Sequence, residues 1–214
     1  MVGDEPPYVV AHRAANSLEG LQLAGGTGAR LHECDIHLFW GRLEVRHLKT
    51  IGTIPILWDR WFLANPFTPR LLLADLLRAT GSRQHLMLDL KGLRTTVGVR
   101  VRRELVGFAH PITVCSRNWS ALEALRGLPL VRRVYSVGSE RQLRALLRRF
   151  GPSSLDGVSI NAGLLSPQVV QELRVRAPTV MSWPITSTGQ ARQLIAWGVR
   201  GLITEHPEAL DLTT

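Results

Sequence analysis

The sequence predicts an α/β fold, a single-domain (β/α)₈ TIM barrel. Three observations favour this class. Short apolar runs alternate with amphipathic stretches from end to end, which is typical of βα units that build a parallel sheet. Eight such runs occur, with seven helical stretches between them. The length of 214 residues lies near the lower end of the roughly 200 to 400 residues that such barrels use.

Each expected strand is a short run of apolar residues bounded by turn-forming residues. The strands are expected at residues 8–11, 29–38, 85–90, 112–116, 131–137, 157–161, 179–184 and 201–204. The second strand continues through a hairpin-like extension over residues 41–47. A stretch rich in proline and tryptophan follows at 48–68, and we expect it to be a short loop insertion within one domain spanning residues 1–214.

The expected helices are marked by apolar residues at helical spacing and by capping residues. Asn16 is the predicted N-cap of the first helix, with Glu19 in the capping-box position. The second helix opens with Pro69 at its first position, and Ser166 precedes the sixth. Helices two to seven are expected at residues 69–80, 95–108, 120–128, 139–150, 167–176 and 188–197. Only residues 205–214 follow the last strand, so an eighth helix would be short or missing.

A doubly wound open sheet is the main alternative to the barrel. Such a sheet usually carries a glycine-rich phosphate loop directly after its first strand. The first expected strand is followed here by His12-Arg13-Ala14-Ala15, which contains no glycine. The sequence therefore favours the closed barrel.

Composition excludes several classes of protein. Hydrophobic residues make up 45% of the chain and charged residues 20%, which suits a globular domain. No apolar run approaches the roughly 18–20 residues that span a bilayer, and residues 1–7 do not resemble a signal peptide. Cys34 and Cys115 lie in expected strands and need not pair. We therefore expect a cytoplasmic protein without stable membrane insertion.

The net charge of +9 is compatible with nucleic acid, an anionic membrane or a phosphorylated substrate as partner. Almost all the cations are arginines on helical stretches, such as Arg100, Arg102 and Arg103. Neither aromatic residues interleaved with basic ones nor a zinc-finger spacing is present, so we expect no nucleic-acid partner. Lysine occurs only at Lys49 and Lys91, each beside a motif described below.

Ionisable residues gather where the first three strands end, which is the end at which barrels of this kind carry chemistry. Glu33 and Asp35 lie two apart in the second strand and therefore share a face. Asp89 and Lys91 have the same relationship at the end of the third strand, where they could also form an internal ion pair. Burying so many ionisable groups together costs several kcal/mol unless they bind something. The set consists of His12, Arg13, Glu33, Asp35, His47, Asp89 and Lys91.

These residues fall in motifs that resemble those of the glycerophosphodiester phosphodiesterases. The stretch His12-Arg13-Ala14-Ala15-Asn16-Ser17 resembles the opening His-Arg-Gly…Glu-Asn-Thr signature of that family. Glu33-Cys34-Asp35-Ile36-His37-Leu38 is similar to its Glu-x-Asp-Val-x-Leu stretch. Glu44-Val45-Arg46-His47 resembles the segment that ends in its second histidine, and Leu88-Asp89-Leu90-Lys91 resembles its Glu-Ile-Lys.

Two further motifs lie near the end of the chain. Trp183-Pro184 resembles the closing tryptophan of the family. Residues 198–207 resemble its Gly-Val-Asp-Gly-Ile-x-Thr-Asp-x-Pro run. The motifs occur in the family's order over nearly the whole chain, and the ordered set is much more specific than any one of them.

The resemblance implies a metal-dependent phosphodiesterase that hydrolyses glycerophosphodiesters to glycerol 3-phosphate and an alcohol. The implied metal ligands are Glu33, Asp35 and Asp89, the implied acid–base pair is His12 and His47, and the implied substrate-binding residues are Arg13, Lys91 and Trp183. Carboxylate ligands suit a hard divalent cation, Mg²⁺ or Ca²⁺. The sequence does not choose between the two ions, assign acid and base to the two histidines, or indicate an oligomeric state.

Three departures from the family's pattern bear on activity. Asp89 stands where the family has glutamate, although the sphingomyelinase D-like relatives also carry aspartate there. Leu48 replaces the aspartate after the second histidine, which removes an orienting partner. The insertion at 48–68 is short for the family and carries Trp58, Trp61 and Phe67, which could form an apolar wall for a lipid-like group or pack beneath the loop.

Two alternatives keep the barrel and change its function. One is phospholipase D-like or sphingomyelinase D-like action on lysophospholipids. The other is a catalytically silent phosphate-binding barrel, which would not need two histidines together with three carboxylates. Four further residues after strands could line the pocket or have structural roles, namely Cys115, Ser116, Asn161 and Glu205.

Overall fold

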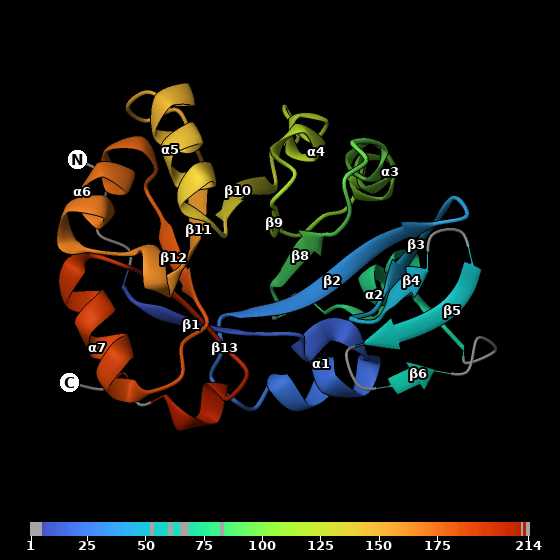
Figure 1. Ribbon diagram of the computed structural model, residues 1–214. Helices are drawn as coiled ribbons and strands as arrows, with labels where there is room; N and C mark the ends of the chain where they lie inside the picture. The colour runs from blue at the N-terminus through green and yellow to red at the C-terminus, as the bar shows by residue number, and fades with distance from the viewer. Residues whose placement is uncertain are drawn as a thin grey trace.

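Eight parallel strands close into a barrel (Figure 1) in this computed structural model, which describes residues 6–51, 54–59, 62–64, 69–81, 84–210 and 212. Neighbouring strands pair in parallel around the ring, and β1 pairs with both β13 and β2 to close it. The closed ring confirms the predicted (β/α)₈ barrel and excludes the open sheet. In ring order the strands are β1 (Tyr8–Ala11), β2 (Leu31–Phe39), β8 (Leu86–Leu90), β9 (Ile112–Ser116), β10 (Val131–Val137), β11 (Gly157–Asn161), β12 (Val180–Trp183) and β13 (Gly201–Thr204).

The helices lie outside the strands (Figure 1). They are α1 (Leu18–Ala24), α2 (Leu73–Ala79), α3 (Thr96–Leu105), α4 (Trp119–Glu123), α5 (Glu140–Arg149), α6 (Pro167–Arg176) and α7 (Thr188–Trp197), with 3₁₀ turns η1 (Ala14–Asn16), η2 (Ala162–Leu164) and η3 (Pro207–Ala209). Helices α3 and α4 approach so closely that a Cβ on Gly98 would lie 1.9 Å from the carbonyl oxygen of Ala121. After β13 the described residues form only η3, as expected for a short or missing eighth helix.

The barrel has an apolar layer on each face of its strands. Leu86, Leu88 and Leu90 of β8 belong to the outer layer, which packs against the helices. Met87 lies on the other face of β8, in an inner cluster that includes Val134, Met181 and Ile203. This inner layer is full, because a Cβ on Gly201 would lie 2.5 Å from Met181 Cγ. The inner apolar layer is therefore closely packed, and the polar residues lie next to it at the carboxyl ends of the strands.

A hairpin extends the barrel wall beyond β2. Strand β3 (Arg42–Val45) pairs antiparallel with β2, and β7 (Leu71–Leu72) pairs antiparallel with β3. Buried Glu44 joins these segments through ion pairs with Arg46 and Arg70, each at 2.7 Å. The hairpin turns the chain back on itself, and so it returns His47 to the side of β2.

Several expected element boundaries were wrong, including those of α1, α2 and α4. The N-cap of α1 is Ser17, whose Oγ accepts a hydrogen bond from Gly20 N at 3.0 Å, and not Asn16. Helix α2 begins at Leu73 instead of Pro69, because the two preceding leucines pair with β3. Helix α4 is shorter than expected and ends at Glu123.

The described residues of the segment at 48–68 form strands, where a loop was expected. Strands β4 (Lys49–Ile51), β5 (Ile54–Asp59) and β6 (Phe62–Ala64) form a separate antiparallel sheet there. Trp58 lies on β5, where Lys49 Nζ is 5.6 Å from the centre of its ring. Trp61 and Phe67, the other two aromatics expected to form an apolar wall, lie outside the described residues.

Two further sequence expectations concern the cysteines and the membrane. Cys34 and Cys115 are buried and unpaired, as expected. In the part of the chain that the structure describes, no helix has the length and apolar character needed to cross a bilayer.

Candidate active site

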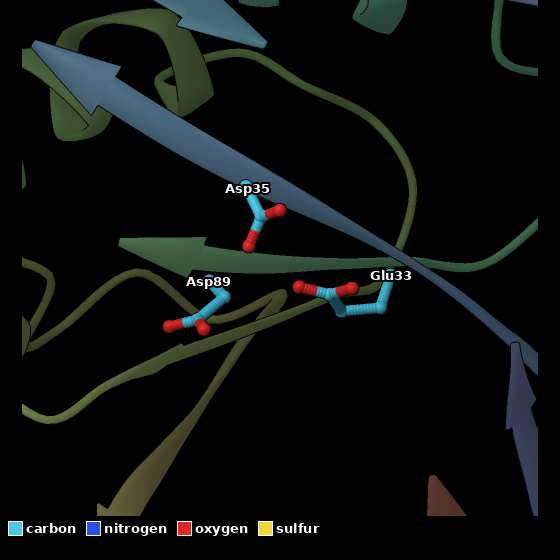
Figure 2. Close-up of side chains that lie close together, drawn as sticks. All are labelled: Glu33, Asp35 and Asp89. Carbon is cyan, nitrogen blue, oxygen red and sulfur yellow. The ribbon is translucent and has the colours of Figure 1, made fainter. Parts of the chain in front are cut away.

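Three carboxylates meet at the carboxyl ends of two neighbouring strands. Glu33 and Asp35 extend from one face of β2, and Asp89 extends from β8 beside them (Figure 2). Asp35 and Asp89 are directly opposed in the register of these strands. One carboxylate oxygen from each residue lies within 4.8 Å of the other two. Glu33 and Asp35 are only 3% and 1% exposed, so their mutual repulsion is little screened by solvent.

The carboxylate cluster is short of positive charge. Burial, together with the nearby charges of Asp35 and Asp89, raises the pKa of Glu33 to about 8. A single backbone donor offsets part of this shift, since Arg13 N donates to Glu33 Oε2 at 2.7 Å. Arg13 has a left-handed backbone with φ of 58°. Oxygen donors with unmet negative charge fit a hard divalent cation.

Lys91 supplies one positive charge to the cluster. Its Nζ lies 2.6 Å from Asp35 Oδ1 and also donates a hydrogen bond to Asp89 Oδ2. Burial acts to lower the pKa of Lys91, but the charges of Asp89, Asp35 and Glu33 outweigh it and raise the pKa above its usual value. Lys91 therefore remains an ammonium group, and it contacts two of the three carboxylates directly.

Asp35 has three neighbours besides Lys91, and the most distant is Arg13, whose Nε lies 3.8 Å from Asp35 Oδ2. Asn16 Nδ2 donates to Asp35 Oδ2 at 3.1 Å, and Asn16 Oδ1 accepts from Asp35 N at 2.8 Å. His47 Nδ1 lies 3.2 Å from the same Oδ2. Burial acts to raise the pKa of Asp35, but Lys91 and the Asn16 hydrogen bond lower it overall. An ionised carboxylate only accepts hydrogen bonds, so His47 Nδ1 is the donor in this contact.

His12 lies against another carboxylate of the cluster. Its Nε2 is 3.8 Å from Glu33 Oε2, and its Nδ1 is 3.4 Å from Glu205 Oε1. Glu205 also pairs with Arg13 Nη1 at 3.3 Å. Burial, followed by the charge of Arg13, lowers the pKa of His12. His12 is therefore neutral at pH 7 and can accept a proton.

A cavity of about 410 Å³ opens above the inner apolar layer. Its charged lining includes His12, Arg13, Glu33, Asp89 and Lys91, and Trp183 and Arg117 also line it. Asp35 and His47 contact the cluster but are not among the described residues that line this cavity. Ion pairs and hydrogen bonds thus connect seven of the eight predicted site residues. The eighth, Trp183, lines the same cavity.

The four further candidates divide into two pairs. Cys115 and Glu205 line the cavity. Ser116 Oγ instead donates to the carbonyl oxygen of Leu90 at 2.8 Å, and Asn161 Oδ1 accepts from Gly163 N at 3.0 Å. Both of these side chains therefore form hydrogen bonds with the backbone.

Sequence reasoning missed two residues at this site. Asn16 was expected to be a helix cap, yet its amide binds Asp35. The family-like Asn-Ser pair at 16–17 was the available signal for it. Arg117 follows β9 and reaches the cavity without belonging to any recognised motif. Leu48 supplies no acid beside His47, and Asp35 is a carboxylate neighbour of this histidine.

No family model matches the sequence, and no curated protein matches it. Solved structures do match. A phosphodiesterase of Oleispira antarctica in complex with sn-glycerol-3-phosphate is 20% identical with a TM-score of 0.74, and the match covers 95% of this chain and 94% of that one. A glycerophosphodiester phosphodiesterase of Parabacteroides distasonis is 20% identical with a TM-score of 0.75, covering 96% and 95%. The corresponding enzyme of Thermotoga maritima is 16% identical with a TM-score of 0.72, covering 95% and 96%.

The fold and site define a (β/α)₈ barrel with a carboxylate cluster at the carboxyl ends of its strands. The form of that barrel is the one found in solved glycerophosphodiester phosphodiesterases, matched over nearly the whole of both chains. At this level of sequence identity, the likeness establishes the fold.

Proposed function

We propose that this chain is a metal-dependent phosphodiesterase that hydrolyses glycerophosphodiesters to glycerol 3-phosphate and an alcohol. The observation that carries the proposal is the convergence of Glu33, Asp35 and Asp89 within 4.8 Å, with His12 against one carboxylate and His47 against another. The sn-glycerol-3-phosphate bound to the Oleispira antarctica barrel supports this substrate class. The whole chain would act as one barrel domain, with the small sheet at 48–68 as its insertion.

Glu33, Asp35 and Asp89 would hold the ion. Their donor atoms are all carboxylate oxygens, which suits Mg²⁺ or Ca²⁺. When bound, the ion offsets the negative charge that develops on the phosphate oxygens during displacement. The raised pKa of Glu33 supports this assignment, because it marks a carboxyl group whose ionisation is unfavourable until a cation binds beside it.

Arg13 and Lys91 would hold the phosphate of the substrate. Arg13 lines the cavity, and its Nε makes no hydrogen bond within the described chain but lies 3.8 Å from Asp35 Oδ2. Lys91 lines the cavity and is fully protonated. Both residues can make charge-assisted hydrogen bonds to phosphate oxygens. Trp183 would contact the glycerol or alcohol portion from the other side of the cavity.

His12 and His47 would move the protons. Water attacks phosphorus as one histidine takes its proton, and the bond from phosphorus to the alcohol oxygen breaks as the other histidine donates a proton to that oxygen. His12 is neutral at pH 7 because its pKa is lowered, which favours it as the base. We assign His47 as the acid, and Asp35 Oδ2, 3.2 Å from its Nδ1, would orient the ring.

Product analysis tests the proposal. The protein is incubated with glycerophosphodiesters in Mg²⁺ or Ca²⁺, and the phosphorus products are identified by ³¹P NMR. Hydrolysis gives glycerol 3-phosphate and free alcohol. A cyclic phosphodiester, or turnover confined to lysophospholipids, would indicate the sphingomyelinase D-like or phospholipase D-like reaction instead. Binding of phosphate without turnover of any diester would indicate a silent phosphate-binding barrel.

A further inference from the structure

Arg117 reaches across the mouth of the barrel to Trp183. It follows β9, whereas Trp183 ends β12, three strands further around the ring. The guanidinium carbon of Arg117 lies 4.9 Å from the centre of the Trp183 ring. Both residues line the 410 Å³ cavity. The indole ring therefore supports the guanidinium group at the cavity wall.

The path of Arg117 is kept open by a glycine. Gly138 follows β10, and a Cβ at this position would lie 3.2 Å from both Nε and Cζ of Arg117, which is tighter than most such contacts. Gln142 of α5 secures both segments, since it accepts from Gly138 N at 2.8 Å and donates to the Arg117 carbonyl oxygen at 3.5 Å. The backbone around the arginine is thus fixed, and no side chain at residue 138 displaces the guanidinium group.

The charge of Arg117 is not balanced within the described chain. Arg13 pairs with Glu205 and Asp35, and Lys91 pairs with Asp35 and Asp89. Arg117 has no carboxylate within ion-pair distance among the described residues, although it lines the same cavity. Contact with an aromatic ring uses only the face of a guanidinium group, so its N–H donors remain available at the edge. These donors match the oxygens of a carboxylate or phosphate.

We propose that Arg117 and Trp183 form a second anion-binding subsite, which binds a carboxylate or phosphate group carried by the alcohol portion of the diester substrate. This inference rests on the proposed phosphodiesterase function. The diester phosphate itself would be held at the carboxylate cluster by Arg13 and Lys91. Arg117 is left for a second negative group further along the substrate. The subsite would make the protein select diesters with anionic head groups.

Two substrates that differ by one carboxylate test this subsite. Glycerophosphoserine and glycerophosphoethanolamine are compared in the wild type, in Arg117→Gln and in Arg144→Gln. Arg144 is an exposed arginine paired with Glu140 on α5, outside the cavity. We expect the wild type to have the higher kcat/KM for the serine diester. The serine-to-ethanolamine ratio should fall about tenfold in Arg117→Gln, as the loss of one charge-assisted contact predicts, and stay unchanged in Arg144→Gln.

Two results would overturn the subsite. An equal fall for both substrates would place Arg117 on the diester phosphate, and an undiminished serine preference in Arg117→Gln would remove the arginine from recognition. If the wild type turned over neither diester, the proposed function would be refuted but the subsite would still be open to a binding test. The dissociation constants of the same two compounds, measured by calorimetry, would then decide the subsite. A tenfold loss of serine-over-ethanolamine preference in Arg117→Gln would support it, and an unchanged preference would refute it.

Discussion

The side-chain amide of Asn16 binds Asp35 at two points. Asn16 Nδ2 donates to Asp35 Oδ2 at 3.1 Å, and Asn16 Oδ1 accepts from the backbone N–H of Asp35 at 2.8 Å. The same Oδ2 faces His47, while the other carboxylate oxygen faces Lys91. Asn16 therefore fixes a carboxylate that is itself a proposed metal ligand and that contacts the proposed acid His47.

We expect Asn16→Ala to weaken metal binding by roughly 10- to 100-fold, which is typical when a partner of a metal ligand is removed. Stability should fall by roughly 1–3 kcal/mol, because a buried N–H loses its acceptor. Calorimetric titration with Mg²⁺ or Ca²⁺ and urea unfolding measure the two effects. Ser17→Ala is the matched control, since it removes a helix cap next to Asn16 and should leave metal affinity unchanged. Wild-type metal affinity in Asn16→Ala would contradict a role in positioning Asp35.

Lys91→Met should fold and lose most of its turnover, because it removes a phosphate ligand. In chelator it should also be less stable, by up to roughly 3–5 kcal/mol, since Asp35 would lose its cation. Added metal ion should restore much of that stability, because it supplies positive charge to the same carboxylates. Thermal unfolding of Lys91→Met with and without metal measures this change in stability. Lys49→Met, which changes the chain's other lysine, is the control. An unchanged kcat/KM in Lys91→Met would reject its role in the reaction.

The raised pKa of Glu33 predicts a pH-dependent stability in the absence of metal. Between the ordinary value of 4.5 and the folded value of about 8, the folded protein retains a proton that the unfolded chain has released. Raising the pH through this window should therefore lower the free energy of unfolding, by at most about 1.4 kcal/mol per pH unit. Urea unfolding in chelator measures the slope. Glu33→Gln should flatten it, and an identical slope in that variant would show that Glu33 is not its source.

His12→Ala and His47→Ala should each lower kcat by roughly 10²–10⁴-fold, as expected for general acid–base groups. Steady-state kinetics at saturating metal isolates this effect from metal affinity. His110→Ala is the control, because His110 precedes β9 and contacts Phe108 at the opposite end of the barrel. Turnover close to the wild-type value in either active-site variant would remove that histidine from the proton transfers.

The barrel was predictable because its strands are buried on both faces and therefore form continuous apolar runs. The runs at 112–116, 131–137 and 157–161 match β9, β10 and β11 residue for residue. The error at the start of α2 occurred where pairing is non-local. Leu71 and Leu72 look like the start of a helix, yet they pair with Val45 and Glu44 far earlier in the chain. Local sequence carries no signal for such a partner.

Strand periodicity made part of the site predictable, namely which side chains share one face of a strand. The spacing of two placed Glu33 and Asp35 on one face of β2, and the structure has them so. Asn16 and Asp35 lie 19 residues apart on different elements, so the periodicity of a strand or helix does not predict the hydrogen bonds between them. Arg117 was missed for a related reason, because its partner Trp183 lies on a distant strand.

The metal requirement is tested most directly by measuring kcat/KM for a glycerophosphodiester in excess chelator and again after Mg²⁺ or Ca²⁺ is restored. The wild type should lose turnover in chelator and regain it with the ion. Glu33→Ala and Asp35→Ala should stay inactive in both conditions, with circular dichroism showing that they are folded. Full wild-type activity in excess chelator would contradict a metal site formed by Glu33, Asp35 and Asp89.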